Sequence, residues 1–277
     1  MTSRQTPPRL LTIAGSDSGG GAGIQADLKT FAAHGAYGMS VITALTAQNT
    51  RCVRAVHEVP PEIVAAQIDA VMEDIGADAI KIGMLASAPI AEAVAGRLRF
   101  WLERSPVPVV LDPVMIAKSG DPLLRADAVD AILQKLLPLC TVVTPNLPEL
   151  ERLAGLPVGT EDERVQAAAK LAKSGPAVLA KGGHAPGSKL VDILVEAGGE
   201  THRFSHPRVE TLSSHGTGCT LSSAIAARLA RGDDLPLAVR GAIGYLEGAL
   251  MAAYPLGSGH GPVDHLYDLF SEAEVTT

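Results

Sequence analysis

Short apolar segments of strand length alternate with longer segments in which apolar positions recur at helical spacing. The apolar segments predict strands at residues 9–14, 39–45, 78–82, 107–111, 141–144 and 177–180. The periodic segments predict helices at residues 23–34, 61–75, 89–103, 127–137 and 161–173. Repeated strand–helix units of this kind are typical of a parallel, doubly wound sheet, whose ligands bind beyond the carboxyl ends of the strands.

The last third of the chain follows a different pattern. Residues 190–197 and 201–206 predict a β-hairpin, because the Gly198-Gly199 pair between them is a typical turn. Two further helices are expected at residues 217–230 and 235–253. An antiparallel pair followed by two helices would extend and cover the parallel sheet.

The composition favours one well-packed domain. Hydrophobic residues make up 47% of the chain and charged residues 19%, which is enough apolar material for a sizeable core and argues against disorder. Aromatic residues make up only 3%, so the core must consist of aliphatic side chains, as in a sheet covered by helices on both faces. Because no linker or internal repeat interrupts the sequence, we expect a single domain over residues 1–277, with residues 1–8 as a flexible N-terminus.

The charge and cysteine content exclude several classes of protein. The formal net charge is -7 and no long basic segment is present, which argues against a nucleic-acid partner. The three cysteines show neither a CxxC pair nor metal-ligand spacing, as expected of reduced thiols in the cytoplasm. No segment approaches the roughly 18 uninterrupted apolar residues of a membrane span, and residues 1–9 do not resemble a signal peptide. We therefore expect a cytoplasmic protein without a membrane partner.

The segment from Ser214 to Thr220, SHGTGCT, is the most informative for chemistry. Its glycines let backbone N–H groups converge, and the helix expected after them adds partial positive charge, so the segment predicts an anion site. Cys219 lies at the start of that helix, where the pKa of a thiol is expected to fall. The alternative is a glycine-rich turn that buries a small, inert thiol.

A second glycine-rich segment, GSDSGGGAG at residues 15–23, follows the first predicted strand. It lacks the Lys-Ser/Thr ending of a Walker P-loop, and it does not fit a dinucleotide-binding fingerprint either. Asp27, in the helix that follows, is placed to face a ligand held over the loop. By itself the segment is also compatible with a flexible loop that binds nothing.

Three charged residues follow predicted strands. Asp112 and Glu149 lie where two neighbouring strands end, and carboxylates there are able to share one Mg²⁺. Lys181 follows another strand and precedes two glycines, which would let a phosphate approach closely. The alternatives are a helix cap or surface role for each carboxylate and an ordinary solvated lysine.

Read in order, the segments AGSDSGGGAGIQADLKT, TALTAQNT, KIGML, DPVMIAKSG, TPNLPEL, KGGH and HGTGCTLSSAIAA resemble the hydroxymethylpyrimidine kinase branch of the ribokinase superfamily. The resemblance extends from about Leu10 to Leu269. It implies a ribokinase-like three-layer α/β/α fold with a mostly parallel central sheet. It also implies that ATP with Mg²⁺ phosphorylates the hydroxymethyl group of 4-amino-5-hydroxymethyl-2-methylpyrimidine, and then its monophosphate, for thiamine biosynthesis. Members of the superfamily often form homodimers.

The resemblance assigns roles to residues of this chain. The residues expected against the pyrimidine are Asp27, Gln48, Gly15, Met84 and Val114. Those expected at the phosphates and the metal are Asp112, Glu149, Lys181, Gly216, Thr217, Gly218 and Cys219. Most of the superfamily has an aspartate base where this chain has Cys219, and the cysteine is typical of the pyrimidine branch.

Three alternatives remain open from the sequence. The first is a pyridoxal or pyridoxine kinase, whose substrate is also a flat ring with a hydroxymethyl group. The second is a thiol hydrolase, with Cys219 as nucleophile and His184 or His215 as base. The third is a ligand-sensing protein that kept the fold and lost catalysis. Residues 121–125 and the turn near Gly198 are the two candidates for a lid over the substrate.

Overall fold

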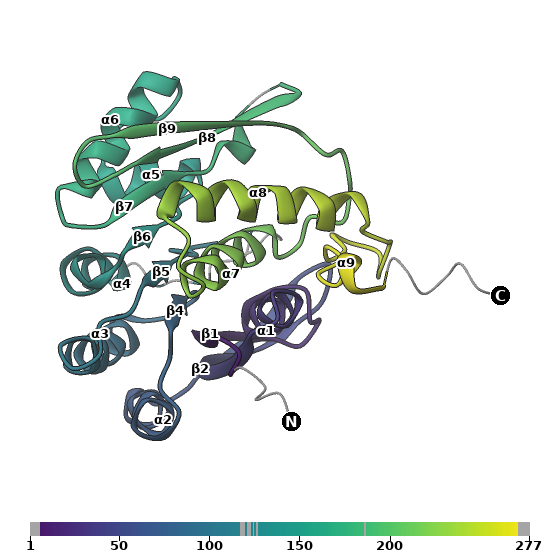
Figure 1. Ribbon diagram of the computed structural model, residues 1–277. Helices are drawn as coiled ribbons and strands as arrows, with labels where there is room; N and C mark the ends of the chain where they lie inside the picture. The colour runs from purple at the N-terminus through teal and green to yellow at the C-terminus, as the bar shows by residue number, and fades with distance from the viewer. Residues whose placement is uncertain are drawn as a thin grey trace, which may run out of the picture.

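A nine-stranded sheet forms the centre of the structure, a computed structural model that describes residues 6–116, 120, 123, 125, 127–185 and 187–270 (Figure 1). The strand order is β3-β2-β1-β4-β5-β6-β7-β8-β9. The strands are β1 (Arg9–Asp17), β2 (Tyr37–Gln48), β3 (Val53–Glu58), β4 (Ala79–Ile82), β5 (Val109–Leu111), β6 (Val142–Val143), β7 (Ala177–Ala180), β8 (Lys189–Val195) and β9 (Thr201–Pro207). The strands from β2 to β7 in this order are parallel, whereas β3, β8 and β9 pair antiparallel.

Helices cover both faces of the sheet, as Figure 1 shows. The helices are α1 (Gly23–Ala33), α2 (Pro61–Asp74), α3 (Ala88–Leu102), α4 (Ala128–Ala131), α5 (Leu147–Ala154), α6 (Glu161–Ala172), α7 (Thr217–Leu229), α8 (Leu235–Met251) and α9 (Tyr267–Phe270). One buried aliphatic cluster packs α2, α3, α4, α5 and α6 against the sheet, and a second packs α1, α7 and α8 against the other face. The predicted three-layer α/β/α fold with a mostly parallel sheet is therefore confirmed.

Most predicted elements occur within a few residues of their expected bounds, and the exceptions have local causes. The helix expected at residues 127–137 divides into α4, a π-helical turn and a 3-10 turn that contains Pro138, which has no N–H to continue α-helical bonding. Strand β3 was not predicted, because it lies at the sheet edge and its side chains are mostly exposed. Helix α5 was not predicted either, since the residues after Thr144 were interpreted only as a strand end.

The parallel topology brings the ends of distant segments to one edge. The carboxyl ends of β1, β4, β5, β6 and β7 all point the same way, so the residues that follow them meet there. Strand β8 runs antiparallel to β7, with Val178 opposite Val195. The hairpin turn near Gly198 consequently lies at the amino ends of the parallel strands, on the side of the sheet away from these residues. This placement contradicts the expectation that the turn is a lid.

Some sequence expectations fall partly outside the described residues. Residues 121, 122 and 124 of the other lid candidate lie there, as do residues 1–5 of the expected flexible N-terminus. Pro8, the last residue of that expected N-terminus, is held against β2, because its carbonyl accepts a hydrogen bond from the N–H of Tyr37 (2.8 Å). In the described part of the chain, no helix is both long and apolar enough to cross a membrane.

Candidate active site

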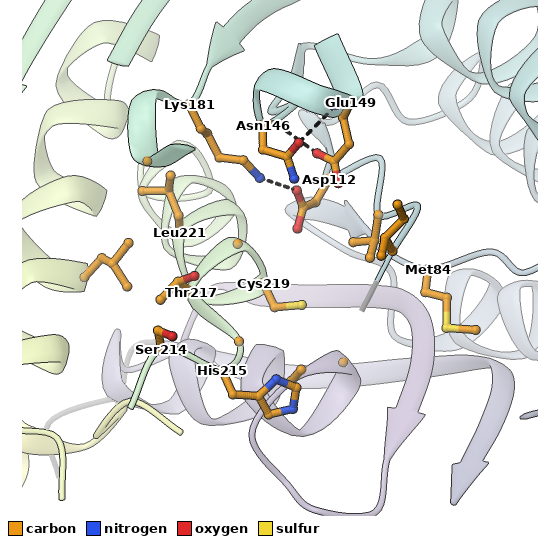
Figure 2. Close-up of a pocket in the computed structure, with 18 of the residues that line it drawn as sticks. Met84, Asp112, Asn146, Glu149, Lys181, Ser214, His215, Thr217, Cys219 and Leu221 are labelled. Carbon is orange, nitrogen blue, oxygen red and sulfur yellow. Dashed lines mark hydrogen bonds and ion pairs between the residues drawn. The ribbon is translucent and has the colours of Figure 1, made fainter. Parts of the chain in front are cut away.

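A cavity of about 590 Å³ lies at the carboxyl edge of the parallel strands, against the N-terminus of α7. Eleven of the twelve site residues predicted from the sequence line it, and the cavity brings together segments that are more than 200 positions apart in the chain. These residues are Gly15, Gln48, Met84, Asp112, Val114, Glu149, Lys181, Gly216, Thr217, Gly218 and Cys219. Figure 2 shows several of them converging from different elements.

Asp27 is the exception, and the expectation that it contacts the substrate is contradicted. Its side chain is fully buried behind the cavity wall. Its carboxylate accepts hydrogen bonds from Lys81 Nζ (2.8 and 2.9 Å), Thr12 Oγ1 (2.6 Å) and Ser223 Oγ (2.7 Å). A carboxylate with this set of partners has no free face for a ligand. It instead compensates the buried charge of Lys81, which does line the cavity.

The anion site predicted before α7 has the expected backbone form. Gly216 adopts a left-handed conformation (φ +82°), and a side chain there would overlap the carbonyl oxygen of Gly21 in the other glycine-rich loop. Gly218 faces the charged residues across the cavity, since a Cβ built on it would lie 3.1 Å from Asp112 Oδ2 and 3.3 Å from Lys181 Nζ. The absence of side chains here leaves the start of α7 open to an anion.

The environment of Cys219 contradicts the expected low pKa. Burial raises the pKa of the Cys219 thiol to about 11, and the nearby charges of Asp27 and Asp112 act in the same direction. The ammonium group of Lys81 opposes them without reversing the shift. A helix N-terminus lowers the pKa of a thiol, but at Cys219, which is half-buried, desolvation has the larger effect. The thiol is therefore protonated at neutral pH in the free protein.

Asp112, Lys181 and Glu149 form a buried charged cluster, in which Figure 2 shows Lys181 and Glu149 approaching Asp112 from either side. Lys181 Nζ donates to Asp112 Oδ1 (2.8 Å), and Thr144 Oγ1 donates to the same oxygen (3.2 Å). Burial and the charge of Asp112 raise the pKa of Glu149 above its usual range, although Lys181 opposes them. Two buried carboxylates facing one lysine are a donor set that suits a divalent cation.

Glu149 also has the structural role that the sequence left open as an alternative. Its Oε2 accepts a hydrogen bond from the N–H of Asn146 (2.8 Å), and Asn146 Oδ1 accepts one from the N–H of Glu149 (3.0 Å). This capping box begins α5 and fixes the carboxylate at the cavity wall. The cap interpretation is therefore correct, and the same residue remains available to the site.

Asp17 and His215 line the cavity, but the sequence analysis gave them no role in binding. Asp17 accepts hydrogen bonds from the N–H groups of Gly19, Gly21 and Ala22 (2.8–3.0 Å), which closes the glycine-rich loop around its carboxylate. His215 Nε2 lies 2.9 Å from Asp17 Oδ2. An aspartate within a run of glycines was the available signal, because such a carboxylate is well placed to accept several loop N–H groups.

A second unpredicted cluster lines the far end of the cavity, between β8, β9 and α8. His206 Nε2 lies 3.3 Å from Asp192 Oδ2, and His206 Nδ1 lies 3.5 Å from Glu247 Oε1. Interaction with Asp192 raises the pKa of His206, although burial opposes it. Glu247 Oε1 is buried and has no hydrogen-bond partner among the described residues. The polar Asp192 within an otherwise apolar strand was the only signal for this cluster in the sequence.

Comparison with known proteins decides the family. A sequence model described as phosphomethylpyrimidine kinase matches residues 17–264. The chain belongs to the phosphomethylpyrimidine kinase family. It is accordingly a phosphotransferase with a ribokinase-like fold, related to enzymes of thiamine biosynthesis.

Relatives of the family match almost the whole chain. The hydroxymethylpyrimidine/phosphomethylpyrimidine kinase of Streptomyces coelicolor is 51% identical over 261 residues, which cover 94% of this chain and 95% of the relative. The crystal structure of phosphomethylpyrimidine kinase from Clostridium difficile is 44% identical, with a TM-score of 0.77 over 88% of this chain and 99% of that one. Pyridoxal kinase from Staphylococcus aureus, in complex with AMP-PCP and pyridoxal, is 30% identical, with a TM-score of 0.86 over 98% and 97% of the two chains.

The family assignment contradicts the thiol hydrolase alternative, and so does the site. A nucleophilic cysteine requires a lowered pKa or an adjacent base. The pKa of Cys219 is raised, and His215 Nε2 faces Asp17 rather than the thiol. The side chain of His184, the other candidate base, lies outside the described residues.

Proposed function

We propose that this protein uses ATP and Mg²⁺ to phosphorylate the hydroxymethyl group of 4-amino-5-hydroxymethyl-2-methylpyrimidine, and then the resulting monophosphate. The observation that carries the proposal is the continuity of the cavity. A single space joins the surroundings expected for the ring, at Gln48 and Met84, to the glycine-rich start of α7 and the charged pair Asp112 and Lys181. A ring alcohol and a terminal phosphate are therefore able to meet within one site.

The ring end of the cavity suits a flat, partly polar heterocycle. Gly15 and Met84 both line the cavity and pack so closely that a Cβ at Gly15 would lie 2.9 Å from Met84 Sδ, so a side chain at position 15 would displace the Met84 side chain. Val114 lines the same cavity, and Gln48 adds an amide that is able to hydrogen-bond a ring nitrogen or amino group. These features support the roles proposed for Gly15, Gln48, Met84 and Val114, and none of them depends on Asp27.

The phosphate end suits ATP with a divalent cation. Lys181 and the N–H groups at the start of α7 are placed to hold the transferring phosphoryl group. Asp112 and Glu149 would hold Mg²⁺, directly or through water, which would offset the charge of two buried carboxylates. The metal would supply neutralisation of the charge on the phosphate oxygens. Pyridoxal kinase structures that contain ADP and AMP-PCP support ATP as the donor.

Cys219 needs no thiolate in this proposal. Phosphoryl transfer passes through a loose transition state in which the attacking alcohol requires little activation. The protonated thiol lies beside Gly218 at the start of α7, where its sulfur would accept a hydrogen bond from the alcohol. After attack, the sulfur would take the alcohol proton while the S–H proton passes to an oxygen of the transferred phosphoryl group. Gly216, Thr217 and Gly218 contribute backbone donors to the same region.

The proposal is tested by supplying ATP with the pyrimidine alcohol or with pyridoxal and resolving the products by mass. Formation of the pyrimidine monophosphate and then the diphosphate is the expected result. Turnover of pyridoxal alone would assign the chain to the other substrate, which the high TM-score of 0.86 to a pyridoxal kinase makes the second candidate. ATP turnover with either alcohol would exclude the ligand-sensing alternative, and absence of turnover with both would contradict the proposal.

We also propose that the enzyme works as a homodimer in the cytoplasm. The support is the superfamily resemblance for the dimer, and free cysteines at positions 52, 140 and 219 for a reducing compartment. Light scattering of the purified protein is expected to give twice the chain mass of 28.6 kDa. A mass near that of one chain would contradict the dimer without affecting the kinase proposal.

A further inference from the structure

Gln48, His215 and Asp17 form a hydrogen-bonded row along one wall of the cavity. His215 Nε2 lies 2.9 Å from Asp17 Oδ2 and 3.0 Å from the amide nitrogen of Gln48. The side chains of Asp17 and His215 are only 3% and 12% exposed, so water does not replace these contacts. One imidazole nitrogen therefore lies within hydrogen-bond distance of both a carboxylate and an amide.

The backbone fixes all three residues in place. The main chain of Gln48 exchanges two hydrogen bonds with the hydroxyl of Ser18, at 2.7 and 2.8 Å. The N–H of His215 donates to the carbonyl of Gly261 (2.9 Å), and its ring packs against Gly21, where any side chain would collide with it. Because these backbones are fixed, the main movement still possible among the three side chains is rotation of the Gln48 amide group.

The chemistry of Asp17 decides which atom of His215 carries a proton. Although burial opposes ionisation, hydrogen bonds from His215 and the loop N–H groups hold the pKa of Asp17 below its usual range. An ionised carboxylate only accepts hydrogen bonds, so His215 Nε2 must carry a proton. This conclusion is the same for a neutral and for a doubly protonated imidazole.

The proton on His215 in turn decides the orientation of Gln48. With the amide nitrogen at 3.0 Å, two N–H groups would face each other, which is repulsive. A half-turn of the amide places its oxygen against the His215 N–H and its NH₂ group away from it. Amide oxygen and nitrogen are assigned from such partners, and here the partners favour the turned orientation.

We propose that Asp17 and His215 are positioning residues that hold the Gln48 amide oxygen on His215 and present its NH₂ group to the substrate. Gln48 is then a hydrogen-bond donor, and this chain selects a ring that offers an acceptor at that point. The inference rests on the proposed function, because it concerns how Gln48 recognises the pyrimidine ring through a hydrogen bond.

The two candidate substrates differ at the relevant ring position. In the aminopyrimidine, the ring atom two positions from the hydroxymethyl-bearing carbon, on the amino side, is N3, which has a lone pair and no proton. In pyridoxal the corresponding atom is a carbon that bears a hydroxyl group. A fixed NH₂ donor matches N3 and matches a phenolic hydroxyl less well, because the hydroxyl must first turn its own proton away. The row would thereby favour the pyrimidine.

The test compares the pyrimidine with its 3-deaza analogue, in which N3 is replaced by C–H. The wild-type chain is expected to prefer the pyrimidine by roughly tenfold or more in kcat/KM, the value of a good hydrogen bond. In His215→Leu this preference should largely disappear through a higher KM for the pyrimidine, while the KM for ATP stays unchanged. His215→Gln, which places an N–H near the former Nε2 position, should restore most of the preference.

His202→Leu is the matched control, because His202 lies on the hairpin at the opposite edge of the sheet. Equal discrimination by the wild type and His215→Leu would overturn the inference, as would a loss confined to kcat. If the wild type phosphorylates the pyrimidine but accepts the analogue equally well, only the inference fails. If the wild type does not phosphorylate the pyrimidine at all, the proposed function fails and the inference fails with it.

A measurement on the unaltered protein covers the case in which a variant does not fold. Long-range ¹H–¹⁵N spectra of the imidazole nitrogens are expected to show a protonated Nε2 for His215. A tautomer with the proton only on Nδ1 would overturn the inference, since His215 would then be unable to donate to Asp17.

Discussion

At the scale of single residues, the site depends on buried charges that compensate one another. Asp27 is bonded to Lys81, and Lys81 in turn lies close enough to Cys219 to affect the pKa of its thiol. Asp112 is bonded to Lys181, and its charge also acts on the pKa of the same thiol. Each pair is held by desolvated contacts, so the loss of one member leaves a charge without compensation.

The thiol of Cys219 is expected to react slowly at neutral pH. Because burial raises its pKa to about 11, only a small fraction is thiolate, the form that reacts with iodoacetamide. Modification of the Cys219 peptide, followed by mass spectrometry, should accelerate throughout the range from about pH 7 to 10 without a plateau. A rate that levels off near pH 7 would show a low pKa and would restore Cys219 as a candidate base.

The buried pair of Asp27 and Lys81 gives a stability prediction. Asp27→Asn should lower the free energy of unfolding by about 3–5 kcal/mol, because it leaves a fully buried ammonium group without its counter-charge. Adding Lys81→Met should recover part of this loss but not all of it, because the amide in place of the Asp27 carboxylate keeps only one accepting oxygen for the hydroxyls of Thr12 and Ser223. Urea unfolding of both variants measures the difference. A double variant that is less stable than Asp27→Asn would contradict this account.

At the scale of elements, two helices begin with the same capping motif, but only one of the two motifs includes a residue of the site. Helices α5 and α6 both begin with a capping box, Asn146 with Glu149 and Thr160 with Glu163. Asn146 and Glu149 line the cavity, whereas Thr160 is exposed to solvent and Glu163 is partly exposed. Loss of either capping box should destabilise its helix, but only loss of the first should also move a residue of the site.

Asn146→Ala and Thr160→Ala are therefore a matched pair. Each should lower the free energy of unfolding by about 1 kcal/mol through the loss of its cap. Only Asn146→Ala should also raise the Mg²⁺ concentration needed for half-maximal activity, because the N–H of Glu149 loses its acceptor, Asn146 Oδ1, and the first turn of α5, which carries the Glu149 carboxylate, is held less firmly. Magnesium titrations of the two variants, beside urea unfolding, decide the point. An equal effect of both variants on the Mg²⁺ requirement would refute a role for Glu149 at the metal.

The elements also show what the sequence was able to predict. Buried strands and long helices were found because their apolar periodicity reflects the core directly. The edge strand β3 has mostly exposed side chains and so carries no such signal. Asn146 and Glu149 were visible in the sequence, where a metal role and a cap role for Glu149 were alternatives, and no local pattern shows that the capping residue also lines the cavity. Local patterns therefore predicted the elements better than the double roles of residues within them.

At the scale of the whole molecule, burial decides what local motifs leave open. The glycines before α7 correctly predicted a tight backbone turn at the start of that helix, since backbone geometry is a local property. The exclusion of Asp27 from the cavity and the raised pKa of Cys219 depend on what packs around them from other segments, which no local pattern contains. The cluster of His206, Asp192 and Glu247 likewise exists only because α8 folds back over β8 and β9.

The C-terminal segment gives a prediction for the pH dependence of the whole fold. His265 lies in this segment, where it contacts the Thr220 hydroxyl of α7 (3.1 Å). Burial, with a smaller effect from the charges of Lys29 and His215, lowers the pKa of His265 to about 4. The unfolded chain takes up this proton at about pH 6.5, so stability present above that pH is lost as the pH falls towards 4.

The expected loss attributable to His265 is on the order of 3 kcal/mol between about pH 6.5 and 4. His34, whose pKa burial also lowers, adds a loss of the same sign. Glu149 and His206, whose pKa values are raised in the folded protein, act in the opposite direction, so the wild-type curve alone does not isolate one group. His265→Gln keeps a partner for Thr220 and does not titrate, and urea unfolding at a series of pH values should give it a shallower decline than the wild type. Parallel curves for the two proteins would contradict this account, because they would show that His265 takes up its proton at the same pH in the folded and the unfolded chain. The segment after α8 therefore has two effects, because it packs against the start of α7. Its residues Gly261 and Pro262 hold the backbone of His215 in place, and its residue His265 makes the fold sensitive to mild acid.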